Sequence, residues 1–343
     1  MGKKSFFSYL IFSQLKTFYS YLIIFLFIPT FLWAKKTDDV GYHRFTQTCM
    51  GTEFNLLIDG GNIQHARSAA NQAFLEAHRI NNILSDYLSE SELSKFSQNS
   101  GSSKFYPLSN DLFYVLSRSQ KLALETGGRF DITIGPLSRL WRIARFKKML
   151  PSDEKLINAQ KRVGYKNLIL DYEQKKAKLL KMGMVLDLGG IAKGYAADQM
   201  HKILNEHNVS RFLIDAGGDL LAGQSPLGKA GWKVTIGGKK HPDLPSLFLS
   251  NVAIATSGDL EQSITVNGKT YSHLINPFSG LGLTTLAQVT VIAPTAITAD
   301  SLASASLVLG TVKGIQFLKT IPNVSAYFLE QKGDDIILTQ SVK

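Results

Sequence analysis

Three glycine turns, each at the end of a strand-like run, are the first feature of this sequence that could do chemistry. They are Gly189-Gly190, Gly217-Gly218 and Ser257-Gly258-Asp259. Glycine lets the backbone approach the oxygens of a phosphate and present its N–H groups to them. Lys193 follows the first pair at an expected helix start, where the helix dipole disfavours a cation, so a role beyond helix stability is indicated. A chain with 28 glycines contains such turns for structural reasons as well, and that alternative stays open.

A carboxylate and a hydroxyl are spaced to act together near the C-terminal end. Asp300 and Ser304 lie four residues apart in an expected helix, which puts both oxygens on one face. Together with backbone carbonyls and water, such a pair suits a hard cation such as Mg²⁺. The alternative is an aspartate at a helix start and a small serine packed in a helix rich in alanine and serine.

One histidine and one tyrosine stand where they could take part in a reaction. Asn267-Gly268 between two alternating runs predicts a hairpin, and His273 falls near the end of the returning strand. An imidazole can accept a proton from a hydroxyl near neutral pH, although a structural hydrogen bond is the commoner role of a lone histidine. Tyr87 follows the first long helix and either stacks on a flat ring or packs against the core.

Strand and helix signals that must position these groups alternate from about residue 44 to the end. Apolar residues recur every three or four positions over 63–84 and predict an amphipathic helix. Further helices are expected over 110–126, from the first glycine turn to about 207, and from Thr298 or Asp300 to 309. Short strands are expected at 54–58, 167–170, 177–182, 185–188, 212–215 and 289–292. No linker rich in proline or serine divides the chain, so we expect one compact α+β domain over 42–343.

The first 34 residues have the character of an export signal. Three lysines and no acid make this segment basic, an apolar run over 21–34 follows, and Ala34 ends it. Pro29 interrupts the run, which is shorter than the ~20 apolar residues that a transmembrane helix needs. We expect either cleavage after Ala34 or retention of residues 1–34 as an N-terminal anchor, with the rest of the chain outside the cytoplasm.

The composition excludes several classes of protein. The net charge of +11 fits nucleic acid, an anionic membrane or a polyanionic cofactor, but no binding motif or long basic stripe accompanies it, so no nucleic-acid partner is expected. The single cysteine, Cys49, excludes an intrachain disulfide and a multi-cysteine metal site, and we expect it to be a small buried hydrophobe. Signatures of P-loop, dinucleotide-binding, zinc-protease and serine-hydrolase sites are absent.

Eight segments, taken in order, resemble those of the ApbE-type FAD:protein FMN transferases, also called flavin transferases. They are MGT at 50–52, SDYLSESELSKF at 85–96, TGGRFDITIGPL at 126–137 with LW at 140–141, LDLGGIAKGY at 186–195, DAGGD at 215–219, ATSGD at 255–259, HLINP at 273–277 and TADSLAS at 298–304. Eight motifs in one order outweigh the structural alternatives for the separate signals. Ser304 stands where the family usually has threonine, and Arg129, Ile132 and Asn276 are further departures.

The resemblance implies an ApbE-like mixed α/β domain that binds FAD with Mg²⁺ and moves FMN onto a Thr or Ser hydroxyl of an acceptor protein, releasing AMP. The residues that it implies for FAD binding are Met50, Tyr87, Arg129, Phe130, Asp131, Asp187, Lys193 and Leu274. It implies Gly190, through its carbonyl, with Asp300 and Ser304 as metal ligands. His273 would accept the hydroxyl proton, and Lys193 would stabilise charge on the phosphates.

Two rival functions remain open from the sequence. Water in place of the acceptor hydroxyl would give an Mg²⁺-dependent FAD pyrophosphatase, and loss of catalysis would give a non-enzymatic periplasmic flavin carrier. The resemblance implies a periplasmic location and an acceptor in a membrane electron-transfer complex. The acceptors that it suggests are subunits of a sodium-pumping NADH:quinone reductase or an Rnf complex, or an FMN-binding domain.

Overall fold

The structure, a computed structural model, describes residues 41–237, 243–258, 263–266, 268–285, 287–332 and 335–341. The expected export segment 1–34 lies outside the described residues, as do Asp259 of the third glycine turn and Asn267 of the expected hairpin. None of the helices within these ranges is both long enough and apolar enough to cross a bilayer.

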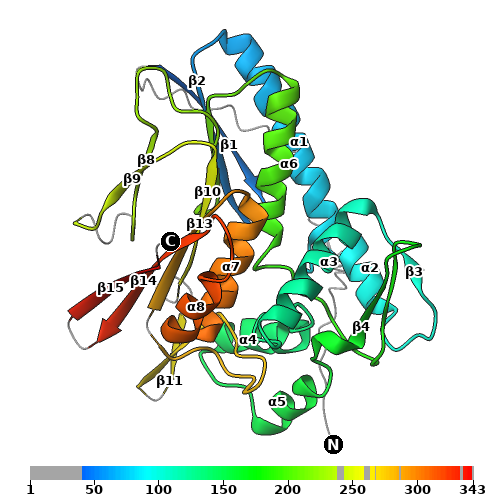
Figure 1. The fold of residues 1–343 in the computed structure, drawn as a ribbon. Coiled ribbons are helices and arrows are strands. Elements are labelled where there is room, and N and C mark those ends of the chain that lie inside the picture. Colours follow the sequence, from blue (N-terminus) through cyan, green and yellow to red (C-terminus); the bar gives the residue numbers. More distant parts are fainter. Residues whose placement is uncertain are drawn as a thin grey trace, which may run out of the picture. The chain divides into compact units, whose positions relative to one another are not determined.

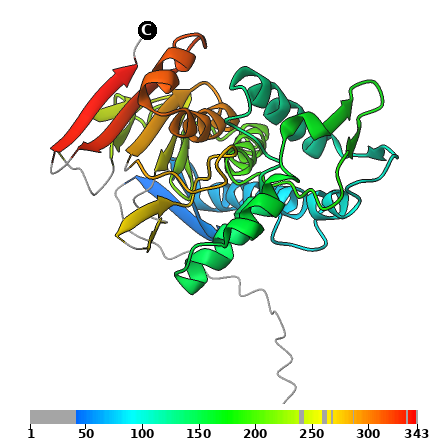
Figure 2. The ribbon, with the colours of Figure 1, turned by 90° about the horizontal axis from the view of Figure 1, so that it is seen from below.

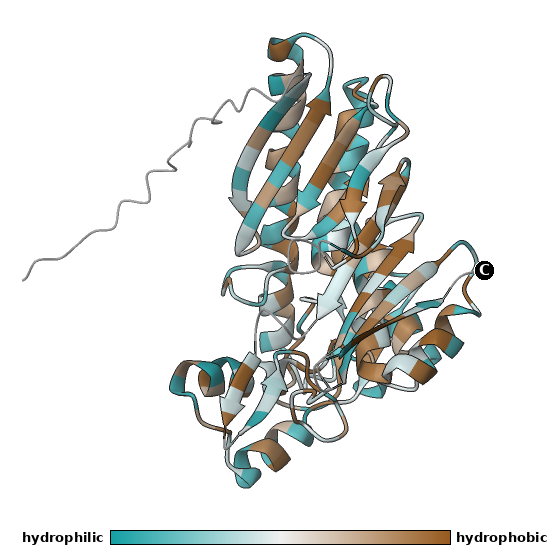
Figure 3. Cartoon of the chain, turned by 90° about the vertical axis from the view of Figure 1, so that its left-hand side faces the viewer, coloured by the Kyte–Doolittle hydropathy of each residue, from teal (hydrophilic) through white to brown (hydrophobic). Residues whose placement is uncertain are grey.

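An eight-stranded antiparallel sheet forms the centre of the fold, in the order β1-β2-β6-β7-β10-β13-β14-β15 (Figure 1). Its strands are β1 (Tyr42–Cys49), β2 (Thr52–Asp59), β6 (Phe212–Ala216), β7 (Asp219–Ala222), β10 (Val252–Gly258), β13 (Ala287–Ala293), β14 (Ser325–Lys332) and β15 (Asp335–Ser341). Apolar and polar residues alternate along the strands (Figure 3), because successive side chains point to opposite faces. In β2, for example, Phe54, Leu56 and Ile58 are buried between exposed or partly exposed neighbours.

Four helices pack with the sheet around the largest hydrophobic core (Figure 1). They are α1 (Ile63–Leu84), α6 (Ala192–Glu206), α7 (Ala296–Leu309) and α8 (Thr311–Leu318). Small residues such as Ala66, Ala69, Ala70 and Ala73 form much of the buried face of α1, which lets it approach α6 closely. α7 lies between α6 and the strands β10 and β13, so its residues 299–307 are all buried, including Asp300 and Ser304.

A short hairpin joins a further cluster of apolar side chains from the sheet. It consists of β8 (Trp232–Thr235) and β9 (Ser246–Leu249). Trp232 is buried with Ile254 and Tyr327, and its indole N–H donates to the carbonyl of Gln224 at 2.9 Å. Strands β6, β7, β10 and β14 therefore contribute side chains both to this cluster and to the main core.

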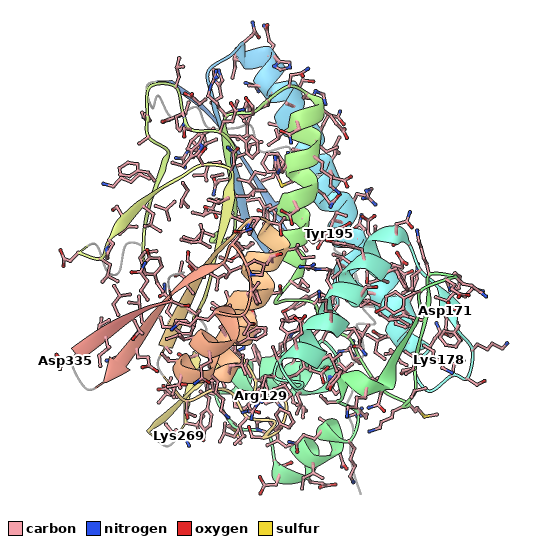
Figure 4. The ribbon with its side chains drawn as sticks, in the orientation of Figure 1. Arg129, Asp171, Lys178, Tyr195, Lys269 and Asp335 are labelled. Atoms are coloured by element: carbon pink, nitrogen blue, oxygen red, sulfur yellow. The ribbon has the colours of Figure 1, made fainter. Side chains whose placement is uncertain are left out.

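The remaining elements are α2 (Glu92–Gln98), β3 (Tyr106–Pro107), α3 (Asn110–Glu125), α4 (Gly135–Lys147), α5 (Asp153–Gln160), the 3₁₀ turn η1 (Tyr165–Asn167), β4 (Leu168–Asp171), β5 (Lys176–Leu179), β11 (Ser263–Val266) and β12 (Lys269–Ser272). Figure 2 shows α2, α3 and the strands β3–β5 on the side away from β14 and β15. A separate core cluster holds α4 and α5 to the hairpin β11–β12 through Trp141, Leu156 and Tyr271. Tyr195, labelled in Figure 4, joins α6 to α3 by donating to Asp111 at 2.5 Å.

The expected α+β fold is confirmed, and most expected elements are found. The helix over 63–84 has the predicted bounds, the hairpin ends just before His273, and Cys49 is buried. The strand expected at 185–188 is wrong: Val185 makes only an isolated bridge with Ile134, and the segment is held by single hydrogen bonds to Ser97 and Ile132. The helix α7 begins at Ala296, before the expected Thr298 or Asp300.

The close contact between α6 and α7 gives a test of the fold. A Cβ atom on Gly194 would lie 2.2 Å from the carbonyl oxygen of Ala296, which is backbone and cannot swing away. We expect Gly194→Ala to lower the free energy of unfolding by about 2 kcal/mol or more, because overpacking here must separate two helices. Urea unfolding would measure this change. The exposed Glu206→Ala in the same helix should stay within about 0.5 kcal/mol of the parent, and an unchanged urea midpoint for Gly194→Ala would contradict the expectation.

Candidate active site

One cavity of about 1240 Å³ collects every residue that the sequence predicted for the site. Those residues are Met50, Tyr87, Arg129, Phe130, Asp131, Asp187, Gly190, Lys193, His273, Leu274, Asp300 and Ser304. The volume exceeds the roughly 300–1,000 Å³ that is typical of small-molecule sites, so the cavity is large for a site that takes one small ligand. The walls come from segments as far apart in sequence as the β1–β2 turn and α7.

Lys193 stands at the start of α6 with two carboxylates around its ammonium group. Its Nζ donates to Oδ2 of Asp219, the first residue of β7, and lies 3.8 Å from Oδ1 of Asp300 in α7. Burial lowers the pKa of Lys193, but the two carboxylates outweigh this effect and hold the pKa above its usual range. Lys193 therefore stays charged, and one negative charge remains on the three groups when both carboxylates are ionised.

Asp300 and Ser304 meet the first glycine turn inside the protein. Oδ2 of Asp300 accepts from the N–H of Gly194 at 3.0 Å, and burial raises the pKa of Asp300 to about 7 against the opposing effect of Lys193. The hydroxyl of Ser304 lies 3.1 Å from that of Ser257 at the end of β10. A Cβ atom at Gly190 would come within 2.8 Å of the Ser304 hydroxyl, so only glycine lets the turn approach this group.

These groups fit a hard cation rather than a soft one. The described residues contain no group of three or more His, Cys, Asp or Glu side chains that could hold a metal ion. They do place one buried carboxylate beside two hydroxyls and the backbone of Gly190, all of which offer oxygen. Mg²⁺ is usually bound by one or two carboxylates together with substrate phosphates and water, and this sparse oxygen set matches that pattern.

A second ionic group, centred on Arg142 of α4, was missed by the sequence analysis. Its guanidinium forms an ion pair with Asp86 at 2.6 Å and donates to Asp187 at 3.1 Å, and it lies 3.9 Å from the centre of the Tyr87 ring. Burial and the nearby Asp187 raise the pKa of Asp86, while Arg142 lowers it. Tyr87 is 73% exposed although Arg142 covers part of it, so a large part of its ring remains open to the cavity.

Residues of the loop at 129–133 line the cavity, but their side chains differ in burial and in the groups they contact. The carboxylate of Asp131 is buried and accepts from the N–H and hydroxyl of Thr133 and from the N–H of Tyr165. It therefore fixes the shape of the loop, and direct contact of this carboxylate with a ligand stays a prediction. Arg129, labelled in Figure 4, lies 4.6 Å from the centre of the Phe278 ring at the surface.

The backbone around His273 holds this side chain at the cavity. Ser272 ends β12, its N–H donates to the carbonyl of Leu283, and its hydroxyl accepts from the N–H of Leu274. The carbonyl of Leu274 in turn accepts from the N–H of Leu283 at 2.9 Å.

Met50, near the other end of the sequence, lies in the β1–β2 turn with a left-handed φ of 52°.

The fold and the cavity define an α+β protein with oxygen donors and an open aromatic ring around one large site. The model of the ApbE family matches residues 50–328. An FAD:protein FMN transferase of Haemophilus influenzae is 32% identical over 306 residues, which cover 85% of this chain and 87% of that protein. The ApbE protein of Thermotoga maritima is similar in structure, with a TM-score of 0.78, 26% identity and coverage of 88% and 97% of the two chains. The flavin transferase ApbE of Vibrio cholerae, at 24% identity and a TM-score of 0.75 over the same shares, has the same fold. The chain belongs to the ApbE family.

Arg142 gives a test of the site that needs no ligand. We expect Arg142→Gln to lower the free energy of unfolding by about 1–3 kcal/mol at pH 7.5, because Asp86 and Asp187 lose their shared counter-charge. Without Arg142 the folded-state pKa of Asp86 rises further above its unfolded value. As the pH falls, the folded variant therefore binds a proton at Asp86 before the unfolded chain does, and this stabilises the folded state. The loss of unfolding free energy relative to the parent should shrink toward pH 5.

Urea unfolding at pH 7.5 and pH 5 would measure both effects of Arg142→Gln. Arg139→Gln is the matched control, since Arg139 lies exposed on the same helix and should change little at either pH. A deficit for Arg142→Gln that stays constant or grows as the pH falls would show that the ion pairs are not its cause.

Proposed function

We propose that this chain transfers FMN from FAD to a Ser or Thr hydroxyl of an acceptor protein and releases AMP. The observation that carries the proposal is the content of the cavity: Lys193, Asp300 and Ser304 offer a place for charged phosphates and a cation, and Tyr87 offers an open ring to a flat heterocycle. Membership of the ApbE family and relatives named FAD:protein FMN transferase support the same reaction.

The proposed metal is Mg²⁺, held by Asp300, Ser304 and the carbonyl of Gly190. When bound, Mg²⁺ would neutralise negative charge that builds on the pyrophosphate during the reaction. Lys193 holds Asp219 and Asp300 in place around this position, because its ammonium group contacts both. Its positive charge would also stabilise negative charge on the phosphates, which is the role predicted from the sequence.

The reaction is a displacement at the phosphorus on the riboflavin side of FAD. The acceptor oxygen bonds to this phosphorus, the bond from phosphorus to the bridging oxygen breaks, and AMP leaves with the electron pair. His273 accepts the proton of the attacking hydroxyl. Tyr87 stacks on a flat ring of FAD, and the loop at 129–133 fixes the position of the substrate.

The location and the acceptor belong to the same proposal. The segment 1–34 directs export to the periplasm, and it is either cleaved or kept as an anchor in the inner membrane. The acceptor is a subunit of a membrane electron-transfer complex of the sodium-pumping NADH:quinone reductase or Rnf type, or an FMN-binding domain.

Mass spectrometry would test the transfer directly. Residues 35–343 are incubated with FAD, Mg²⁺ and a candidate acceptor domain. We expect the acceptor to gain the mass of FMN less one water, AMP to appear in equal amount, and EDTA to abolish both. AMP without a gain in acceptor mass would instead indicate a pyrophosphatase, or an acceptor that this enzyme does not recognise, and a second acceptor domain separates these two. FAD that binds without any AMP would identify a carrier and contradict the proposal.

His273→Ala tests the proton acceptor. We expect the rate of FMN transfer to fall by about 10²–10⁴-fold with little change in FAD affinity, because a general base acts in the transition state. Single-turnover transfer and flavin fluorescence titration would measure the two quantities. His65→Ala, at an exposed position of α1, is the control and should keep the parent rate. Transfer by His273→Ala at the parent rate would remove the base assignment.

A further inference from the structure

The C-terminal part of α4 points apolar side chains into solvent. Ile143, Phe146 and Met149 are 53%, 89% and 65% exposed. The three-residue spacing of Ile143 and Phe146 puts them on one side of the helix, and Met149 follows just after its end. The helix stops at Lys148, whose φ of 51° is left-handed, and the N–H of Met149 donates back to the carbonyl of Ala144 at 3.1 Å. This backbone bond fixes the chain where Met149 is held outward.

Cations surround these apolar side chains. Residues 139–148 include five Lys or Arg and no acid, and the next acids along the chain open α5. Arg142 points inward to its two aspartates, but Arg139, Lys147 and Lys148 are exposed. We call the exposed set (Arg139, Ile143, Phe146, Lys147, Lys148 and Met149) the α4 tip. Its apolar and basic side chains are interspersed along the sequence.

This mixture matches the surface of an anionic membrane better than the surface of a protein. Lysine is depleted in the buried centre of protein interfaces, because its charge must be stripped of water there. At a lipid surface, aromatic and aliphatic side chains can enter the boundary between headgroups and acyl chains while lysines reach the phosphates. The α4 tip places Phe146 and Met149 on either side of Lys147 and Lys148, so both contacts can be made at once.

We infer that the α4 tip docks this protein on a membrane containing anionic lipid. Phe146, Met149 and Ile143 enter the headgroup boundary, and Arg139, Lys147 and Lys148 bind lipid phosphates. The docking goes beyond the proposed transfer and does not require it, since no residue of the α4 tip lines the cavity.

The inner face of the same helix connects this docking to the cavity. Ser138, Trp141, Arg142 and Arg145 of α4 line the cavity, one turn or less from the side chains of the α4 tip. A membrane bound at the α4 tip therefore lies beside the cavity wall, and acceptor segments that emerge from the bilayer come close to it. This arrangement brings enzyme and acceptor together in the plane of the membrane.

Co-sedimentation with vesicles tests the docking. Residues 35–343 are used, because they contain every described element and all the core clusters. We expect binding to vesicles of phosphatidylglycerol and phosphatidylcholine, weak binding to phosphatidylcholine alone, and release by high salt. The pair Lys147→Gln and Lys148→Gln should weaken binding by about tenfold or more, as should the pair Phe146→Ser and Met149→Ser.

Matched control variants distinguish vesicle binding through the α4 tip from nonspecific binding to the protein surface. Leu124→Ser on α3, where the side chain is 69% exposed, and Lys121→Gln on the same helix should bind like the parent. As an independent measurement, the fluorescence of Phe146→Trp should shift to the blue when phosphatidylglycerol vesicles are added.

Three results would overturn the inference. They are no difference between the two vesicle types, an equal loss for the α3 controls, and unchanged vesicle binding by Phe146→Ser with Met149→Ser. If that last variant also lowers FMN transfer to an acceptor in the absence of lipid, the α4 tip is a protein-docking surface. Vesicle binding is measured without FAD, so a failure of the transfer reaction leaves this test intact.

Discussion

The placement of one ammonium group between two buried carboxylates is the constraint on which the site depends. Lys193 opens α6, Asp219 opens β7, and Asp300 lies in α7, so three elements far apart in sequence must meet within one ion-pair group. Removing one partner from a buried group of this kind costs about 3–5 kcal/mol, because a charge is left uncompensated. When both carboxylates are ionised, the group carries one negative charge in excess, which favours a cation beside it.

Arg142 performs the corresponding task on another wall of the cavity. It joins the loop after α1, the helix α4 and the segment before the first glycine turn, through Asp86 and Asp187. Neither ionic group could be assembled by neighbouring residues alone, since each needs side chains from three separate segments. The large sheet and its helices matter to the chemistry because they fix the distances between these segments.

The sequence revealed the elements whose signals are local and left out those that tertiary contacts decide. The helix over 63–84 was predicted to the residue because its alanines repeat with helical spacing. The start of α7 was misplaced because its first N–H groups are capped by Asp198 of α6, at 2.8 and 2.9 Å, and nothing near Ala296 in the sequence shows this.

The site residues followed the same rule. Those with glycine, carboxylate or histidine motifs all line one cavity, while their roles in binding and catalysis stay predictions. Arg142 was missed because it belongs to a run of basic residues that looks like solvated surface, and only the fold brings Asp86 and Asp187 to it. The strand expected at 185–188 failed because this segment pairs with a loop and not with a neighbouring strand.

The packing of Gly194 against Ala296 has a consequence for how this protein can change over time. The contact brings the backbone at Gly194 against the carbonyl of Ala296, so any side chain at position 194 would push α6 and α7 apart. Lys193 and Asp300 stand beside this contact on the two helices, so a substitution at 194 would also change the distance between their charged groups. Position 194 is therefore closed to larger amino acids, although glycine itself offers no side chain to the reaction.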